Sequence, residues 1–186
     1  MILTDREIRS YLAARQIELE PAPDTFEGRL SSTALDLLLG AQFDRLRRPD
    51  LGTETVLNPQ AVKARKILRS HLESVQSTED DKSIVLKSGD FVLAWTQEKV
   101  HLHTHARIAA RVEGKSSLAR FGVGIHVTAP TIHAGFSGRI QLEVFHHGPI
   151  PVRLTPGMPI CQLIFEMTLG TPEAGYEGQF QGQISV

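Results

Sequence analysis

The segment from Gly114 to Arg120 combines residue types that bind phosphate. It reads Gly-Lys-Ser-Ser-Leu-Ala-Arg, so a glycine is followed by a cation, two hydroxyls and a second cation. Backbone N–H groups, hydroxyl donors and positive charge together hold phosphate oxygens. If the segment turns helical, Ser116 and Arg120 share a face, because residues four apart are neighbours on a helix. The alternative is a capped turn that enters a short helix and binds no ligand.

Glu143 lies in a stretch that alternates like a strand. Within residues 140–145, Gln141 and Glu143 would face one way, while Leu142 and Val144 face the other. A carboxylate among apolar neighbours is suited to general acid or base chemistry. The alternative is a glutamate on the wet surface of a strand, and the spacing alone favours that alternative.

Three histidines alternate at positions 101, 103 and 105. A strand would project all three imidazoles on one side, where they could hold a metal ion. No Asp, Glu or Cys elsewhere in the sequence clearly completes such a site. The alternative interpretation is an exposed polar strand face.

Cys161 is the single cysteine of the chain. It therefore excludes an intramolecular disulfide framework and any zinc site built from several cysteines. The zinc nucleobase deaminases hold their metal with H-x-E and a later P-C-x-x-C, which this sequence cannot supply. Hydrolytic deamination by this chain would need a metal-free way to activate water.

An N-terminal helix is predicted by a capping box, in which Thr4 is the N-cap and Glu7 follows three residues later. Its apolar face would consist of Ile8, Tyr11 and Leu12. Residues 17–20 then alternate like a strand, and two prolines close that stretch.

A second helix is predicted from Asn58 to about Val75. Asn58 is a good N-cap, and Pro59 at the first helical position has a backbone angle suited to a helix. The apolar residues at helical spacing are Ala64, Leu68, Leu72 and Val75. The polar and charged residues 77–82 predict a solvated loop behind this helix.

Short apolar runs separated by glycine and proline fill the chain from Ser83 onward. The runs cover residues 84–86, 91–95, 108–112, 124–128, 139–145, 151–154 and 160–166. Many short strands at such spacing are typical of a sandwich, jelly roll or small barrel. Residues 170–186 are rich in Gly and Gln and predict a mobile tail. We expect residues 1–186 to form a single, mainly β domain.

The 186 residues carry 20 Lys and Arg against 21 Asp and Glu, a formal net charge of -1. That balance argues against a protein that coats nucleic acid through bulk positive charge. No apolar run approaches the roughly 20 residues that span a bilayer. Asp5 and Glu7 stand where a signal peptide would need an apolar stretch. We expect a cytoplasmic protein without a nucleic-acid or membrane partner.

An ordered set of motifs resembles the dCTP deaminase branch of the dUTPase-like superfamily. The motifs, in chain order, are Ile2-Leu3-Thr4-Asp5 with Ile8, residues 34–40 (Ala-Leu-Asp-Leu-Leu-Leu-Gly), residues 113–122 (Glu-Gly-Lys-Ser-Ser-Leu-Ala-Arg-Phe-Gly), residues 124–129 (Gly-Ile-His-Val-Thr-Ala), residues 134–138 (Ala-Gly-Phe-Ser-Gly), Leu142-Glu143, and Pro156-Gly157-Met158 with Gln162-Leu163. No single motif decides the resemblance, but the ordered set covers most of the chain.

The resemblance implies a homotrimer of distorted β-barrels or jelly rolls, with active sites between subunits. It implies conversion of dCTP to dUTP and ammonia without zinc, with Mg²⁺ bound through the nucleotide triphosphate. Some members of the family continue to dUMP and pyrophosphate.

The resemblance also implies roles for individual residues. The implied catalytic residues are Glu143, Ser116, Arg120 and Ala129. Glu143 would take a proton from the water that attacks C4 of cytosine, Ser116 and the Ala129 carbonyl would orient that water, and Arg120 would stabilise charge near the ring. The implied substrate-binding residues are Lys115, Ser117, Thr131, His133, Tyr176, Gln179 and Gln183. Lys115 and Ser117 would meet the triphosphate, and Tyr176 and Gln183 belong to a tail that folds over the nucleotide.

Four positions depart from the family pattern. His133 stands where the family has aspartate, Lys115 and Thr131 where arginine is usual, and Gln179 where a lysine is usual. The missing aspartate helps activate water for phosphate hydrolysis in dUTPases, so His133 counts against diphosphatase activity. We therefore expect deamination of dCTP to dUTP. The alternatives are a diphosphatase of dUTP or a modified pyrimidine nucleotide, including a bifunctional enzyme that converts dCTP to dUMP, and a nucleotide-binding paralogue without catalysis.

Overall fold

The computed structural model describes residues 1–47, 56, 58–75, 80–178 and 181–183. The helices in this part of the chain are α1 (Asp5–Ala13), α2 (Ala64–Ser70), α3 (Ser116–Ala119) and the 3-10 helix η1 (Thr104–Ala106). The strands are β1 (Ile17–Glu20), β2 (Leu35–Leu46), β3 (Leu72–Ser74), β4 (Ile84–Leu86), β5 (Phe91–Leu102), β6 (Ile108–Glu113), β7 (Val123–Gly124), β8 (Thr131–Ile132), β9 (Ser137–His146), β10 (Val152–Leu154) and β11 (Pro159–Met167). None of the described helices is long and apolar enough to cross a membrane.

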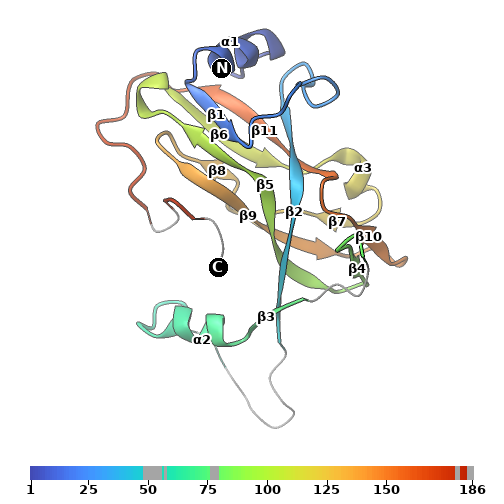
Figure 1. The fold of residues 1–186 in the computed structure, drawn as a ribbon. Coiled ribbons are helices and arrows are strands. Elements are labelled where there is room, and N and C mark those ends of the chain that lie inside the picture. Colours follow the sequence, from blue (N-terminus) through green and yellow to red (C-terminus); the bar gives the residue numbers. More distant parts are fainter. Residues whose placement is uncertain (48–55, 57, 76–79, 179–180, 184–186) are drawn as a thin grey trace.

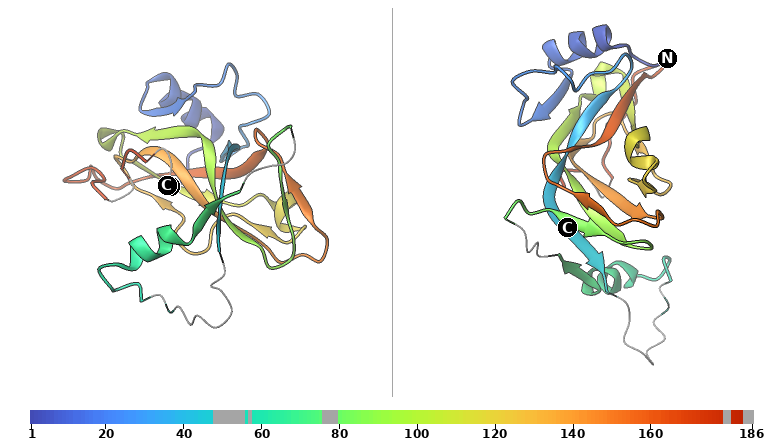
Figure 2. Two further views of the ribbon diagram at one scale, coloured as in Figure 1. Left: turned by 60° about the horizontal axis from the view of Figure 1, so that its bottom comes forward. Right: turned by 90° about the vertical axis from the view of Figure 1, so that its right-hand side faces the viewer.

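One antiparallel sheet dominates the molecule and curls around the core (Figures 1 and 2). Its strand order is β7-β9-β5-β2-β11-β6-β8, with β1 added to β5 and β3 added to β2, and a separate pair joins β10 to β4. β2 and β1 occupy successive parts of the same edge of β5, because Thr96 pairs with β2 whereas Lys99 to Leu102 pair with β1. The mainly β, barrel-like class predicted from the sequence is confirmed.

The core follows from alternation of buried and exposed side chains along the strands. On β2 the side chains of Leu35, Leu37 and Leu39 are fully buried, and on β9 the buried positions include Leu142 and Val144. Because successive side chains of a strand point to opposite faces, burying Leu142 and Val144 turns the residue between them outward. This alternation aims Glu143 away from the core.

A bulge in β5 brings a charged residue into the core. The register with β9 shifts between Trp95 and Lys99, and Glu98 within the bulge is 1% exposed. Arg29 forms an ion pair with Glu98, and the backbone N–H of Leu38 donates to the other carboxylate oxygen of Glu98 at 3.0 Å. The buried charge is therefore both paired and hydrogen-bonded, as a low-dielectric interior requires.

The N-terminal helix is confirmed. The Thr4 N–H donates to the Glu7 carboxylate at 3.0 Å, which completes the predicted capping box, and the Thr4 hydroxyl donates to the same carboxylate. The hydroxyl bond first, and then the N–H bond, lower the pKa of Glu7. Ile8 is fully buried, with Tyr11 and Leu12 partly buried beside it. The predicted strand at residues 17–20 is also present as β1.

The second predicted helix is wrong in its bounds. Helix α2 covers only Ala64–Ser70, and Asn58 instead caps a turn in which its Oδ1 accepts from the Gln60 N–H at 3.0 Å. Residues 72–74 form β3, where Ser74 donates to Asp44 of β2 at 2.8 Å. Pairing with the free edge of β2 thus replaces the last helical turn. Residues 77–79 of the predicted loop lie outside the described residues.

Three other boundaries differ from the sequence prediction. Only Gly124 of the predicted strand 124–128 is in a strand, because β7 ends where the chain bends toward β8. Strand β5 continues beyond Trp95 to Leu102, so it includes His101. His103 follows the end of β5 and His105 lies on η1, so the expectation that one strand carries all three histidines on one face is wrong. Each difference depends on pairing between distant segments, which local sequence does not encode.

Candidate active site

Six residues expected from the sequence line one cavity of about 280 Å³. They are Ala129, Thr131, His133, Glu143, Tyr176 and Gln183. They come from β9, from β8 and the residues on either side of it, and from the C-terminal tail. The fold therefore gathers residues up to 54 positions apart in the sequence, counted from 129 to 183, around one space.

Strand β9 carries the carboxylate of this cavity. Glu143 is half-buried and lies opposite Leu93 of β5, between the buried anchors Leu142 and Val144. Gln141 stands two residues earlier on the same face and also lines the cavity. The carboxylate is thus held on a paired, central strand rather than on a loop.

The bend at residues 128–130 is attached to β6. The Val112 N–H donates to the Pro130 carbonyl at 2.8 Å, and Thr131 then pairs with Arg111 as β8 begins. This attachment fixes Ala129 at the cavity wall, where its backbone carbonyl is an acceptor for a water or a substrate.

The C-terminal tail folds back onto its own chain at this cavity. The Tyr176 ring stacks on the His133 ring, with centroids 5.3 Å apart and an interplanar angle of 10°. The backbone N–H of Tyr176 donates to the Ala134 carbonyl at 3.0 Å. Gln183 exchanges hydrogen bonds with Arg139: its carbonyl accepts at 2.9 Å and its side-chain amide donates at 2.8 Å. The tail residues Tyr176 and Gln183 therefore reach the cavity from the same chain.

Gly135 permits this close approach. It has a φ of +85°, and a side-chain carbon there would lie 2.7 Å from the Tyr176 nitrogen. Glycine alone combines that left-handed backbone with the absence of a Cβ.

His126 and Gln141 line the cavity but were not among the expected site residues. His126 places Nε2 4.0 Å from a carboxylate oxygen of Glu113, and its buried Nδ1 has no hydrogen-bond partner within the described protein. The sequence held a signal for His126, because His126 and His133 bracket the Thr128-Ala129-Pro130 bend. Gln141 shares the strand face of Glu143, which is the signal that could have identified it.

The remaining expected residues do not line this cavity. Ser116, Ser117 and Arg120 are exposed on and just after α3, and Lys115 forms an ion pair with Asp36 of β2. The expected helical turn is present, since the Arg120 N–H donates to the Ser116 carbonyl at 3.1 Å. Within one chain, the basic, hydroxyl-rich turn and the Glu143 cavity are therefore separate. Gln179 lies outside the described residues.

Comparison with known proteins links the whole chain to one group of enzymes. Residues 2–168 match the family model described as dCTP deaminase-like. A protein of Methanosphaera stadtmanae named "dCTP deaminase, dUMP-forming" is 36% identical over 187 residues, which cover 98% of this chain and 89% of that protein. A "dCTP deaminase" of Rhodospirillum rubrum is 35% identical over 178 residues, with 95% and 87% of the two chains covered.

A solved structure shares the fold. The 2'-deoxycytidine 5'-triphosphate deaminase of Agrobacterium tumefaciens superposes with a TM-score of 0.65 at 24% sequence identity. The superposition covers 89% of this chain and 48% of that one, so this chain spans about half the length of the Agrobacterium protein. Given the match of the family model to residues 2–168 and the identity to both curated relatives, this chain belongs to the dCTP deaminase-like family.

Proposed function

We propose that this protein hydrolyses the exocyclic amine of dCTP and releases dUTP and ammonia. The observation that carries the proposal is the cavity in which Glu143 and the Ala129 segment meet His133 and the tail residue Tyr176. A strand-held carboxylate, a backbone acceptor and an aromatic cover are suited to a nucleobase and an attacking water. The names of the two curated relatives support deamination of dCTP.

In the proposed reaction Glu143 acts as general base. Its carboxylate takes a proton from water while the water oxygen bonds to C4 of cytosine, and N3 becomes protonated as the ring loses its aromatic character. Glu143 passes the proton it took from water to N3, then takes the proton of the new C4 hydroxyl and gives it to the C4 amine, so that the C4–N bond breaks and ammonia leaves as the C4 carbonyl forms. One water is consumed and one ammonia is released, so the atoms balance. The Ala129 carbonyl and Ser116 orient the water.

A neighbouring copy of the chain supplies the second half of the proposed site. Ser116, Ser117 and Arg120 are exposed on the turn around α3, outside the cavity of their own chain. In a homotrimer with sites between subunits, this turn would face the cavity of the next copy, with Lys115 and Ser117 at the triphosphate. Arg120 would stabilise negative charge that develops on the reacting base.

In the proposed reaction Mg²⁺ is bound through the nucleotide triphosphate, and protein side chains catalyse the deamination. Within the described residues, the one group of three ligating side chains close enough for a shared ion is Glu18, His101 and His103, none of which lines the cavity. The donors that do line it are His126, His133 and Glu143. Within the described residues these three side chains are not gathered closely enough to share an ion, so the cavity fits a general base better than a resident metal centre.

The test of the mechanism is Glu143→Gln, which keeps the shape of the side chain but removes its basicity. Ammonia release from dCTP should fall by about 10²–10⁴-fold, the usual contribution of a general base. Glu73→Gln is the control, because Glu73 is a surface carboxylate on β3 with 59% of its side chain exposed. Turnover by Glu143→Gln at the rate of this control would contradict the assignment.

A second product is favoured by the names of relatives, since the Methanosphaera protein and several others of similar identity are named as dUMP-forming. His133, exposed at the cavity and stacked under Tyr176, favours dUTP, because an imidazole cannot replace the expected carboxylate directly. The two possible products, dUTP and dUMP, are distinguished by incubating the protein with dCTP and Mg²⁺. The nucleotides are then separated by anion exchange, and ammonia and pyrophosphate are assayed. Ammonia with dUTP supports our proposal, and dUMP with pyrophosphate overturns the proposed product. Tight nucleotide binding without either product would indicate a binding protein without catalysis.

A further inference from the structure

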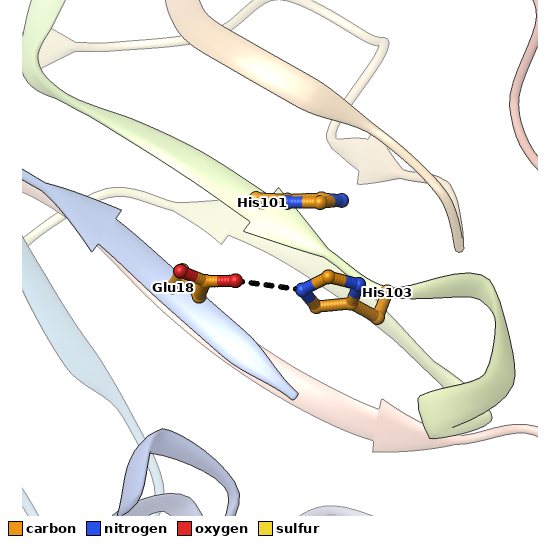
Figure 3. A group of neighbouring side chains, drawn as sticks. All are labelled: Glu18, His101 and His103. Atoms are coloured by element: carbon orange, nitrogen blue, oxygen red, sulfur yellow. Dashed lines mark hydrogen bonds and ion pairs between the residues drawn. The ribbon is translucent and has the colours of Figure 1, made fainter. Parts of the chain in front are cut away.

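The pairing of β1 with β5 brings a carboxylate to two imidazoles more than 80 residues further along the chain, one at the end of β5 and one just after it. Glu18 of β1 is the register partner of His101 on β5, and Glu18 Oε1 lies 2.7 Å from Nε2 of His103. The rings of His101 and His103 have centroids 3.9 Å apart. Figure 3 shows Glu18 pointing toward His103, with His101 beside them. Their ligating atoms all lie within 4.8 Å of one another.

The positions of these side chains are imposed by the fold. Leu102 between the two histidines is fully buried, so both imidazoles point to the outer face of the sheet. On β1 the buried neighbours Ile17 and Leu19 turn Glu18 to the same outer face. All three side chains are half-buried, which leaves an approach for an ion.

The electrostatics of the cluster favour a cation. Partial burial, and then the neighbouring His103, lower the pKa of His101 below its ordinary value of 6.5, so its nitrogen lone pair is free at neutral pH. The hydrogen bond from His103, more than the nearby Arg15, lowers the pKa of Glu18 and keeps it ionised. Arg15 is 3.4 Å from Glu18 with 82% of its side chain exposed, an arrangement that contributes little.

We propose that Glu18, His101 and His103 form a binding site for a divalent transition metal of the zinc class. Two imidazoles and one carboxylate are a ligand set that zinc takes with its fourth position open to water. Tetrahedral bonds of about 2.0–2.1 Å place ligand atoms roughly 3.3–3.4 Å apart, so the cluster closes by small side-chain rotations. The His103–Glu18 hydrogen bond would be replaced by two bonds to the ion, and the proton on Nε2 of His103 would leave to solvent while Nδ1 takes one up, so that the ligand stays a neutral imidazole.

This site is separate from the proposed nucleotide site. His101 pairs across β5 and β9 with Ser137. None of Glu18, His101 and His103 lines the cavity, and Glu143 lies about 20 Å further along β9 from Ser137 at roughly 3.3 Å per residue. A metal here would join β1, near the start of the chain, to β5 in the middle of the sheet. Its role is therefore to stabilise the folded state rather than to take part in deamination.

The test measures zinc binding by nucleotide-free, chelator-treated protein, by calorimetric titration and by metal analysis after gel filtration. We expect one zinc per chain and a melting temperature that rises with zinc concentration, because the ion binds the folded state. Glu18→Gln and His103→Gln, made separately, should each lose stoichiometric zinc and the zinc-dependent rise. Two independent variants guard against one that misfolds, and far-UV circular dichroism confirms the fold of each.

Two other histidines serve as controls. His71 caps the end of α2 and hydrogen-bonds to Ile67, while His105 lies on η1 with its ring centroid 5.2 Å from that of His103. His71→Asn and His105→Gln should both keep one zinc per chain. The proposal is overturned if the parent binds no stoichiometric zinc, or if Glu18→Gln binds it unchanged. It is also overturned if His103→Gln and His105→Gln both lose the zinc while Glu18→Gln keeps it, since the ligands would then be the three histidines.

Discussion

Residues that resemble one another in the sequence have different surroundings in the structure. Glu143, Glu18 and Glu98 all lie on strands with alternating burial, but one lines a cavity, one meets two histidines and one is buried against an arginine. The chemistry open to each carboxylate follows from the segment of the fold that packs against it. Of these three glutamates, the sequence spacing identified only Glu143 as a candidate site residue.

His101 gives the folded protein a pH dependence with a definite sign. Its pKa is lowered in the folded state, chiefly by burial, so between that pKa and 6.5 the unfolded chain binds more protons than the folded one. The free energy of unfolding should therefore fall as the pH drops through 6.5, and rise again with pH. Glu18, whose folded pKa is also lowered, stays ionised in this window and contributes its own loss only at more acid pH.

The expected result is a smaller pH dependence in His101→Gln than in the parent. Urea unfolding between about pH 7 and pH 5, with chelator present, measures it, because histidine is the side chain that ordinarily titrates there. His103, His105, Glu18 and Arg15 face this position and remain the same in both proteins. An equal fall in stability in the two proteins would contradict the assignment to His101.

At the scale of elements, β5 joins both sites, because its pairing with β9 supports Glu143 and its pairing with β1 assembles the metal cluster. The bulge between these two parts lets β5 change partners from β2 to β1. Glu98 and Arg29 hold this bulge in the core, with 2% and 14% of their side chains exposed. The bulge therefore couples the stability of the two halves of the strand.

Glu98→Gln should destabilise the protein by about 3–5 kcal/mol, since it leaves the Arg29 charge without its partner in a largely buried position. Chemical denaturation with circular dichroism measures the change in the free energy of unfolding. Glu20→Gln is the matched control, because it removes an exposed ion pair between Glu20 of β1 and Lys99 of β5. The side chain of Lys99 is 39% exposed and that of Glu20 is 73% exposed. Such a surface pair contributes at most about 1 kcal/mol. Equal effects of the two substitutions would show that burial of the pair does not stabilise the bulge.

At the scale of the whole molecule, the residues proposed for the active site divide into two groups. One group lines the cavity, whereas Ser116, Ser117 and Arg120 are exposed around α3. A ring of identical subunits brings the second group of one copy to the first group of the next, and three such contacts close the ring. The proposed homotrimer thus completes what one chain leaves separate.

Mixing two inactive variants tests this arrangement. Glu143→Gln and Ser116→Ala, co-expressed in equal amounts, form sites in which both halves are intact about one time in four, so about one quarter of parent activity returns. Each variant alone should remain inactive, and light scattering reports the trimer. No recovery in verified mixed trimers would place both residues in a site within one chain.

The sequence by itself was sufficient for the mainly β class, for the capped helix α1, and for the family resemblance that the comparisons confirmed. These depend on local signals: alternation, a capping box, and ordered motifs. It also named six residues that share the cavity, because the motifs carried them. It missed β2 as a strand, the early end of α2, and His126 and Gln141 at the cavity.

Only the tertiary structure decided which residues from distant segments become neighbours. The register of β1 on β5 sets Glu18 beside two histidines, and the fold of the tail sets Tyr176 on His133. Such contacts arise from strand pairing and core packing over long sequence separations, where the favourable free energy comes from burial of the whole sheet. No local pattern specifies that pairing, so the sequence identified donors while the fold determined which of them meet.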